Sequence, residues 1–160
     1  MVKLKKFNST VMRGVKLKKI LTVLFTIMVL TACAETTNND YKFKGESEHW
    51  EAEYAYKGTE VWGEDDGKRT YFNEDSYEFV LKYKGSLEEL SSLQKVEYAY
   101  KARSRNGSGT EEYTAPPNEL LFTSRGSSSG AAKVNEDEVI QVNVKWGDLE
   151  ESFELHNKSK

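Results

Sequence analysis

The feature that most constrains the fold is an alternation of apolar and polar residues that recurs in four runs. In residues 50–56, 77–83, 96–102 and 140–146, aliphatic or aromatic side chains occupy every second position, and mostly charged or polar side chains lie between them. Successive side chains of a β-strand point to opposite faces, so each run predicts a strand with one buried face. Weaker alternation predicts further strands at 59–62, 70–72, 120–124 and 152–155.

The segments between these runs contain residues typical of turns and loops. Asp66-Gly67 and Asn106-Gly107 tolerate the positive φ angles that tight hairpin turns require. Residues 146–149 predict the turn of a C-terminal hairpin, and residues 126–132, which are Ser, Gly and Ala, predict a flexible loop.

Seven or eight short strands joined by such turns predict an all-β fold. We expect a single antiparallel β-sandwich of immunoglobulin-like type over residues 41–156, followed by a polar tail at 157–160. A small antiparallel barrel is the alternative. The chain has one cysteine, so the paired cysteines of true immunoglobulin domains are absent and the expectation concerns architecture alone. Ser86 and Glu89 have capping-box spacing, which predicts one short helix at 86–93.

The charges of the chain divide it into two segments. Residues 1–32 carry seven Lys or Arg and no acidic residue, whereas residues 33–160 carry 16 basic and 26 acidic residues, a formal charge of −10. An acidic body argues against a nucleic-acid partner, because such binding requires a basic surface. The single cysteine excludes an internal disulfide framework and a Cys/His zinc site.

The first segment has the layout of a secretory signal peptide. Residues 20–30 form an uncharged apolar run of eleven residues behind the lysines. A membrane-spanning helix needs about 20 apolar residues, so this run is short for a span and fits a signal peptide. The sequence leaves open whether translation starts at Met1 or at Met12.

The apolar run ends in Leu30-Thr31-Ala32-Cys33, which resembles the lipobox of bacterial lipoproteins. The resemblance implies that residues 1–32 are removed by a signal peptidase that recognises Leu30, Thr31 and Ala32. It also implies that Cys33 is acylated and anchors the protein to the extracytoplasmic face of the cell membrane. Residues 34–40 are polar and predict a tether. The alternatives for Cys33 are a buried thiol, or a cysteine that follows an uncleaved anchor.

The remaining pattern resembles small lipoproteins of low-GC Gram-positive bacteria. Residues 43–50, the Tyr-rich strand that follows, and the closing hairpin at 139–146 and 151–155 carry this resemblance. That group is largely uncharacterised, so the resemblance implies no activity and no catalytic residue.

Few residues are candidates for chemistry. The two histidines are His49 and His156, and His156 lies in the polar C-terminal region. His49 is either a base or a ligand beside Glu46 and Glu48, or an edge residue next to a buried Trp50. No nucleophile elbow or phosphate-binding loop is present in the sequence. We therefore expect no catalytic residue, no cofactor and no metal site.

Two acidic loops and the tyrosines are candidate binding sites. Residues 64–67 and 135–138 offer hard oxygen ligands for calcium, but the first does not fit the EF-hand register, since positions 1 and 12 fall on Trp62 and Asn73. A looser calcium site and a solvated turn both stay open. The tyrosine pairs at 54–56 and 98–100 predict core packing, with a glycan- or peptide-binding face as the alternative. Trp62 is the aromatic residue most expected to be exposed.

These observations predict a membrane-anchored lipoprotein with a non-enzymatic binding or accessory role at the cell envelope. Its partner would be an envelope protein, a peptide or a glycan. The alternatives are a carboxylate-based cell-wall hydrolase, and a protective or immunity lipoprotein.

Overall fold

The computed structural model describes residues 34–91, 94–115 and 119–158. The predicted signal peptide, its residues Leu30, Thr31 and Ala32, and Cys33 therefore lie outside the described residues. The described part contains one short helix and eight strands, with these bounds: β1 (Glu35–Glu46), β2 (Trp50–Asp65), β3 (Lys68–Tyr83), α2 (Leu87–Ser91), β4 (Lys95–Lys101), β5 (Asn106–Glu112), β6 (Leu121–Ser129), β7 (Ile140–Trp146) and β8 (Leu149–Asn157).

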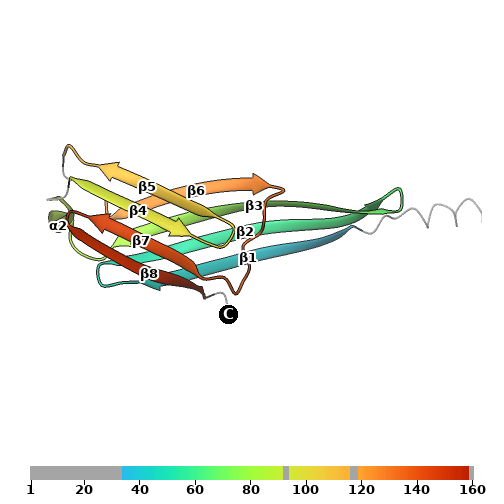
Figure 1. The fold of residues 1–160 in the computed structure, drawn as a ribbon, viewed down its shortest axis with the longest axis horizontal. Helices are drawn as coiled ribbons and strands as arrows, with labels where there is room; N and C mark the ends of the chain where they lie inside the picture. Colours follow the sequence, from blue (N-terminus) through green and yellow to red (C-terminus); the bar gives the residue numbers. More distant parts are fainter. Residues whose placement is uncertain (1–33, 92–93, 116–118, 159–160) are drawn as a thin grey trace, which may run out of the picture.

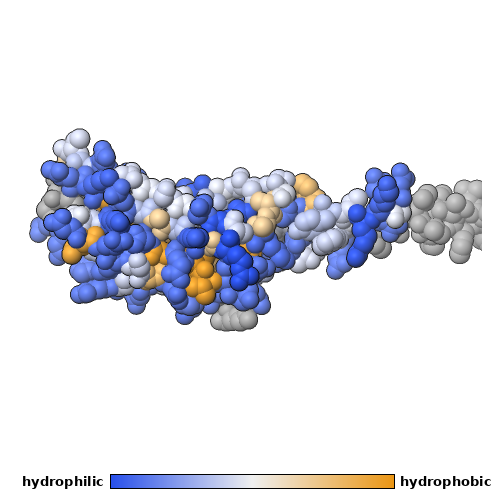
Figure 2. All heavy atoms as spheres, viewed as in Figure 1, coloured by the Kyte–Doolittle hydropathy of each residue, from blue (hydrophilic) through white to orange (hydrophobic). Residues whose placement is uncertain are grey.

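The eight strands form a single antiparallel sheet in the order β5-β4-β7-β8-β1-β2-β3-β6. The sheet curls until it is nearly barrel-shaped (Figure 1). The predicted all-β antiparallel class is confirmed. The finer prediction, an immunoglobulin-like sandwich, stays a prediction. The face of the molecule shown in Figure 2 is mostly hydrophilic, with scattered hydrophobic patches.

The four strong alternations all lie in strands, and their apolar residues form the core. β4 and β7 alternate strictly between buried and solvent-facing side chains along nearly their whole length. The core is rich in aromatic rings, and the Phe79 and Tyr100 rings stack with centroids 4.3 Å apart. The tyrosines at 54, 56, 98 and 100 are all buried in it. Their interpretation as core residues is confirmed, and the alternative of an exposed glycan-binding face is wrong.

Two turns and the helix agree with the sequence. Asp66 and Gly67 have φ angles of 49° and 74° and join β2 to β3, as a tight hairpin turn requires. Gly147, with φ 55°, lies in the turn between β7 and β8. At α2 the Glu89 N–H donates to Ser86 Oγ at 3.3 Å, and the Ser86 N–H donates to Glu89 Oε2 at 3.2 Å, which completes the predicted capping box.

Two glycine-containing segments that the sequence predicts as a turn and a loop lie in strands. Asn106-Gly107 is not a turn but the start of β5, and the preceding turn is closed by the Ala102 N–H donating to the Arg105 carbonyl at 2.7 Å. The predicted loop at 126–132 is also wrong in part, because residues 126–129 belong to β6.

Three strand glycines lie directly opposite tyrosines on the neighbouring strand. The pairs are Tyr100 with Gly107, Tyr98 with Gly109, and Tyr77 with Gly126. A Cβ atom at any of these glycines would lie within 2.6 Å of the tyrosine ring, so each glycine leaves the space that the ring occupies. The glycines therefore serve side-chain packing across the strands rather than chain reversal.

The predicted tether and tail are also corrected. Residues 35–40 form the first half of β1 and pair with β2, from Glu35 opposite Trp62 to Asp40 opposite Lys57. Backbone hydrogen bonds form this ladder without help from apolar side chains, so the alternation pattern could not reveal it. At the other end Asn157 still belongs to β8, and the Lys158 N–H donates to the Lys42 carbonyl at 2.8 Å.

β2 and β3 are each 16 residues long, and the short strands predicted at 59–62 and 70–72 are parts of them. β8 pairs with β1 only at Phe43 and Lys44, and β6 pairs with β3 only from Glu74 onward. Residues 35–41, 57–65 and 68–73 therefore extend beyond their neighbours as a three-stranded projection, here called the tongue (Figure 1).

The two end strands, β5 and β6, share no backbone ladder. Buried polar side chains bridge the opening instead. Arg105, after β4, forms an ion pair with Asp75 of β3, and its Nη2 donates to Ser128 Oγ of β6 at 2.7 Å. Ser128 Oγ in turn donates to Asp75 Oδ1 at 2.9 Å. The Asp75 side chain is 2% exposed and that of Arg105 is 12% exposed.

Removing one partner of this buried ion pair should destabilise the fold strongly. We expect Arg105→Met to lower the free energy of unfolding by about 3–5 kcal/mol, because it leaves the Asp75 carboxylate buried without its cation. Arg125→Met is the matched control, since Arg125 of β6 pairs with Glu78 of β3 but is 72% exposed. Its loss should cost less than about 1 kcal/mol. Urea denaturation measures both, and equal losses would contradict the importance of the buried pair.

Candidate functional site

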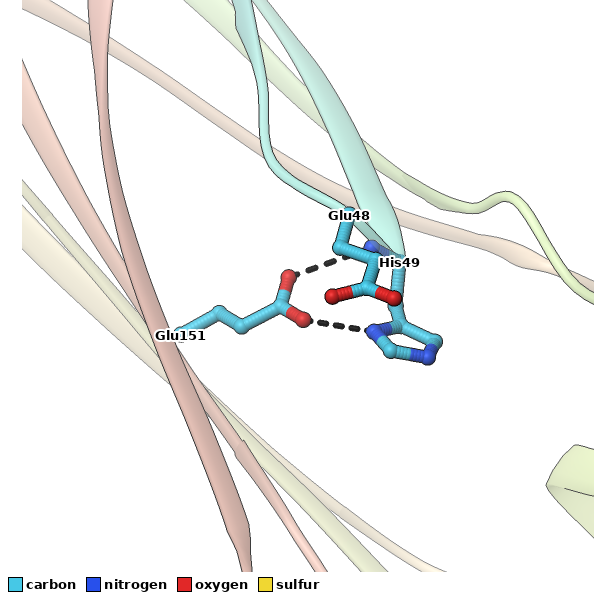
Figure 3. Close-up of side chains that lie close together, drawn as sticks. All are labelled: Glu48, His49 and Glu151. Carbon is cyan, nitrogen blue, oxygen red and sulfur yellow. Dashed lines mark hydrogen bonds and ion pairs between the residues drawn. The ribbon is translucent and has the colours of Figure 1, made fainter.

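Three side chains that could act together meet at the end of the sheet opposite the tongue. Glu48 and His49 lie in the turn between β1 and β2, and Glu151 lies on β8 (Figure 3). His49 Nδ1 is 2.5 Å from Glu151 Oε1, and the His49 backbone N–H donates to Glu151 Oε2 at 3.2 Å. Each of the three residues offers one ligand atom, and these atoms all lie within 4.8 Å of one another.

The turn that carries Glu48 and His49 is held in place by the backbone. The Ser47 N–H donates to the Trp50 carbonyl, and the Lys84 N–H donates to the His49 carbonyl, both at 2.8 Å. The His49 ring packs on Trp146 with centroids 5.6 Å apart. The imidazole therefore has a fixed position, although its side chain is 38% exposed.

The two partners change each other's protonation. The hydrogen bond that the His49 imidazole donates to the Glu151 carboxylate raises the pKa of His49 above its ordinary value, against the opposing effect of burial. Burial alone would raise the pKa of Glu151, but hydrogen bonds from Ser47 and His49 outweigh it, and the pKa of Glu151 is lowered. Both shifts favour the charged forms, so the two residues form an ion pair in mildly acidic solution.

The arrangement can hold a proton or a cation more readily than it can carry out nucleophilic catalysis. One imidazole nitrogen and two carboxylates are ligands that suit a divalent ion such as zinc. A serine nucleophile would need its hydroxyl on the imidazole. Ser47 instead hydrogen-bonds the carboxylate of Glu151.

The sequence identified part of this cluster. His49 and Glu48 are close together as expected, but Glu46 pairs with Lys84 at 3.0 Å and takes no part. Glu151 was missed, because it lies 102 residues from His49. The sequence does contain a signal, because Glu151 lies on the same face of the strand as the buried Phe153 and Leu155. A charged residue on the core-facing side of a strand requires a partner.

The other candidates lie apart from this cluster. His156 is on the exposed side of β8 and pairs with Glu154 at 3.3 Å. Trp62 is 40% exposed, as predicted. Within the described residues, neither acidic loop brings three ligand groups together. Glu138 accepts hydrogen bonds from the backbone N–H groups of Arg103 and Asn135, which makes it part of the loop's own structure.

A groove on the outer face of the sheet is lined by charged residues of β1, β2, β3 and β8, together with the apolar residues Ala52, Val80 and Leu121. Three of its four carboxylates are paired with lysines: Glu53 lies 2.7 Å from Lys44, Glu51 lies 2.6 Å from Lys82, and Glu46 lies 3.0 Å from Lys84. These pairs fix the positions of the side chains, so the groove is a mixed-charge surface.

No family model, no curated protein and no solved structure matches the chain. The one helix of the described residues, α2, has five residues and is too short to span a membrane.

The ion pair between His49 and Glu151 should give the protein a pH-dependent stability. The raised pKa of His49 stabilises the fold below its unfolded value of 6.5, and the lowered pKa of Glu151 does so above 4.5. Glu151→Gln should therefore lower the free energy of unfolding most between pH 4.5 and 6.5, by up to about 1 kcal/mol. This effect should shrink as the pH rises through the folded pKa of His49.

Thermal unfolding across this pH range measures the effect. Glu154→Gln is the control on the same strand, because Glu154 and its partner His156 are both about half exposed. If Glu151→Gln lowers the stability by the same amount at every pH, the ion pair between His49 and Glu151 is not the cause.

Proposed function

We propose that the chain is a lipoprotein held on the extracytoplasmic face of the cell membrane by an acylated Cys33. One observation carries the proposal: the only cysteine of the chain directly follows Leu30-Thr31-Ala32, at the end of an eleven-residue apolar run preceded by seven basic residues. Two acyl chains give stable attachment, whereas one gives only marginal binding.

The start of β1 supports a short connection between the anchor and the domain. β1 begins at Glu35, two residues after Cys33. Two residues span at most about 7 Å, so the folded domain would begin almost at the membrane surface. The anchored domain therefore has far less freedom than a seven-residue tether would give it.

We propose a non-enzymatic binding or accessory role for this domain. A carboxylate-based hydrolase needs a general acid whose pKa is raised. The pKa values of Glu60, Glu150 and Glu151 are all lowered instead, each by hydrogen bonds that favour the carboxylate. The pairing of the groove carboxylates with lysines also favours a binding role. The partner would be an envelope protein, a peptide or a glycan, and nothing in the described residues favours an immunity role over these.

We also propose that the domain has the architecture of an immunoglobulin-like sandwich. The rings of Phe79 on β3 and Tyr98 on β4 stack across the interior, as do residues of the two sheets of a sandwich. The continuous order of the eight strands supports the nearly barrel-shaped sheet more directly than it supports two separate sheets.

Replacing the anchor residue tests the proposal. Cys33→Ala should abolish metabolic labelling with palmitate and release the protein from the membrane fraction, because no thiol remains to be acylated. Thr31→Ala is the matched control, since it keeps a small residue in the lipobox and should preserve labelling. Continued labelling of Cys33→Ala, or no labelling of the natural sequence, would contradict the proposal.

A further inference from the structure

The exposed aromatic residues of the described part are concentrated in the tongue. Trp62, Tyr71 and Phe72 are 40%, 45% and 52% exposed, and the other large exposed hydrophobic residues are aliphatic: Leu87, Leu121, Val139 and Leu149. Trp62 and Tyr71 lie directly opposite each other on β2 and β3, with ring centroids 4.4 Å apart. Phe72 follows Tyr71 and therefore points from the other face of the tongue. A flat partner would cover one face, whereas these rings need an environment that surrounds the tongue.

The tongue is a fixed extension of the sheet. Glu60 is 8% exposed and lies at its root, where it accepts hydrogen bonds from Tyr71 and Lys133, both at 2.8 Å, and from Asn39 at 3.2 Å. These bonds join all three strands of the tongue to the loop that precedes β7. The position of the tip therefore follows from the position of the domain.

The N-terminal end of β1 brings the anchor to these rings. Glu35 is the register partner of Trp62, and Cys33 lies two residues before it. Paired strands lie about 5 Å apart, so the Cα atoms of Cys33 and Trp62 are separated by at most roughly 12 Å. A cysteine whose acyl chains enter a bilayer lies at headgroup level, and Trp and Tyr favour that level because each has an apolar ring with a polar group.

We propose that the tip of the tongue lies in the phospholipid headgroup layer of the membrane, with Trp62, Tyr71 and Phe72 in contact with lipid. This inference rests on the proposed anchor at Cys33. Contact is confined to the headgroups, because Glu64, Asp65 and Asp66 lie at the end of the hairpin and a charge in the hydrocarbon core is costly. The narrow end of the molecule is correspondingly hydrophilic (Figure 2).

The proposed contact also sets the orientation of the domain. β2 runs from Trp50, next to His49, to the tongue hairpin, and its 16 residues span about 50 Å. With the tongue at the membrane, the Glu48–His49–Glu151 cluster faces outward, where a partner can reach it.

The full acylated protein in vesicles of phosphatidylcholine and phosphatidylglycerol provides the test. Trp50 and Trp146 are 0% and 4% exposed, so Trp62 is the tryptophan that contacts solvent among the described residues. With lipids brominated close to the headgroup, the Trp62 fluorescence should be quenched and its emission should shift to the blue. Trp62→Phe gives the signal of the two buried tryptophans, which is subtracted.

A reporter at the opposite end is the matched control. Leu149 is 56% exposed at the start of β8, so Leu149→Trp in the Trp62→Phe background places a tryptophan far from the tongue. This reporter should not be quenched. Equal quenching at both positions, or none at Trp62, would overturn the inference.

Flotation of the same samples separates the two proposals. If the natural protein floats with the vesicles but Trp62 is not quenched, the anchor stands and the tongue contact is wrong. If the natural protein does not float, the proposed anchor is wrong, and the proposed tongue contact, which depends on it, is wrong as well.

Discussion

The rest of the structure depends on one constraint: the single sheet must close although its end strands do not pair. β5 and β6 share no ladder, so side chains must hold the two ends of the sheet together. The buried ion pair of Arg105 and Asp75 does this with Ser128, and the Tyr100 hydroxyl contacts both Tyr77 and Ser124 at 3.1 Å. Buried polar groups stabilise a fold only when each finds its partner in one geometry. They therefore specify how far the sheet curls.

These polar contacts lie in a core that contains five buried tyrosines, and the choice of residue has consequences. Burial raises the pKa of both Tyr56 and Tyr100 to about 12, so their hydroxyls stay neutral and act as hydrogen-bond donors and acceptors. The large rings also need space, which glycines on the neighbouring strands provide. Glycine allows the backbone many conformations, and the tyrosine ring that covers each glycine thus holds it in strand geometry.

The curled sheet separates two regions of different chemistry. At one end, His49 and Glu151 form a partly exposed ion pair that responds to pH and could hold a cation. At the other end, the tongue presents aromatic rings beside the residue that leads to Cys33. With the proposed anchor, the first region is available to partners at the envelope and the second to the membrane. The long β2–β3 hairpin keeps the two apart.

The sequence by itself determined the strand class, the core-facing residues, the hairpin at Asp66-Gly67 and the capping box at Ser86, because each depends on side chains that are close together in the chain. It also contains Leu30-Thr31-Ala32-Cys33, on which the proposed anchor rests and which no tertiary contact defines. Only the tertiary structure decided that residues 35–40 form a strand, that Gly107 and Gly126 pack against tyrosines, and that Glu151 meets His49. Each of these depends on a neighbour distant in the sequence, and local periodicity carries no information about which strands become neighbours.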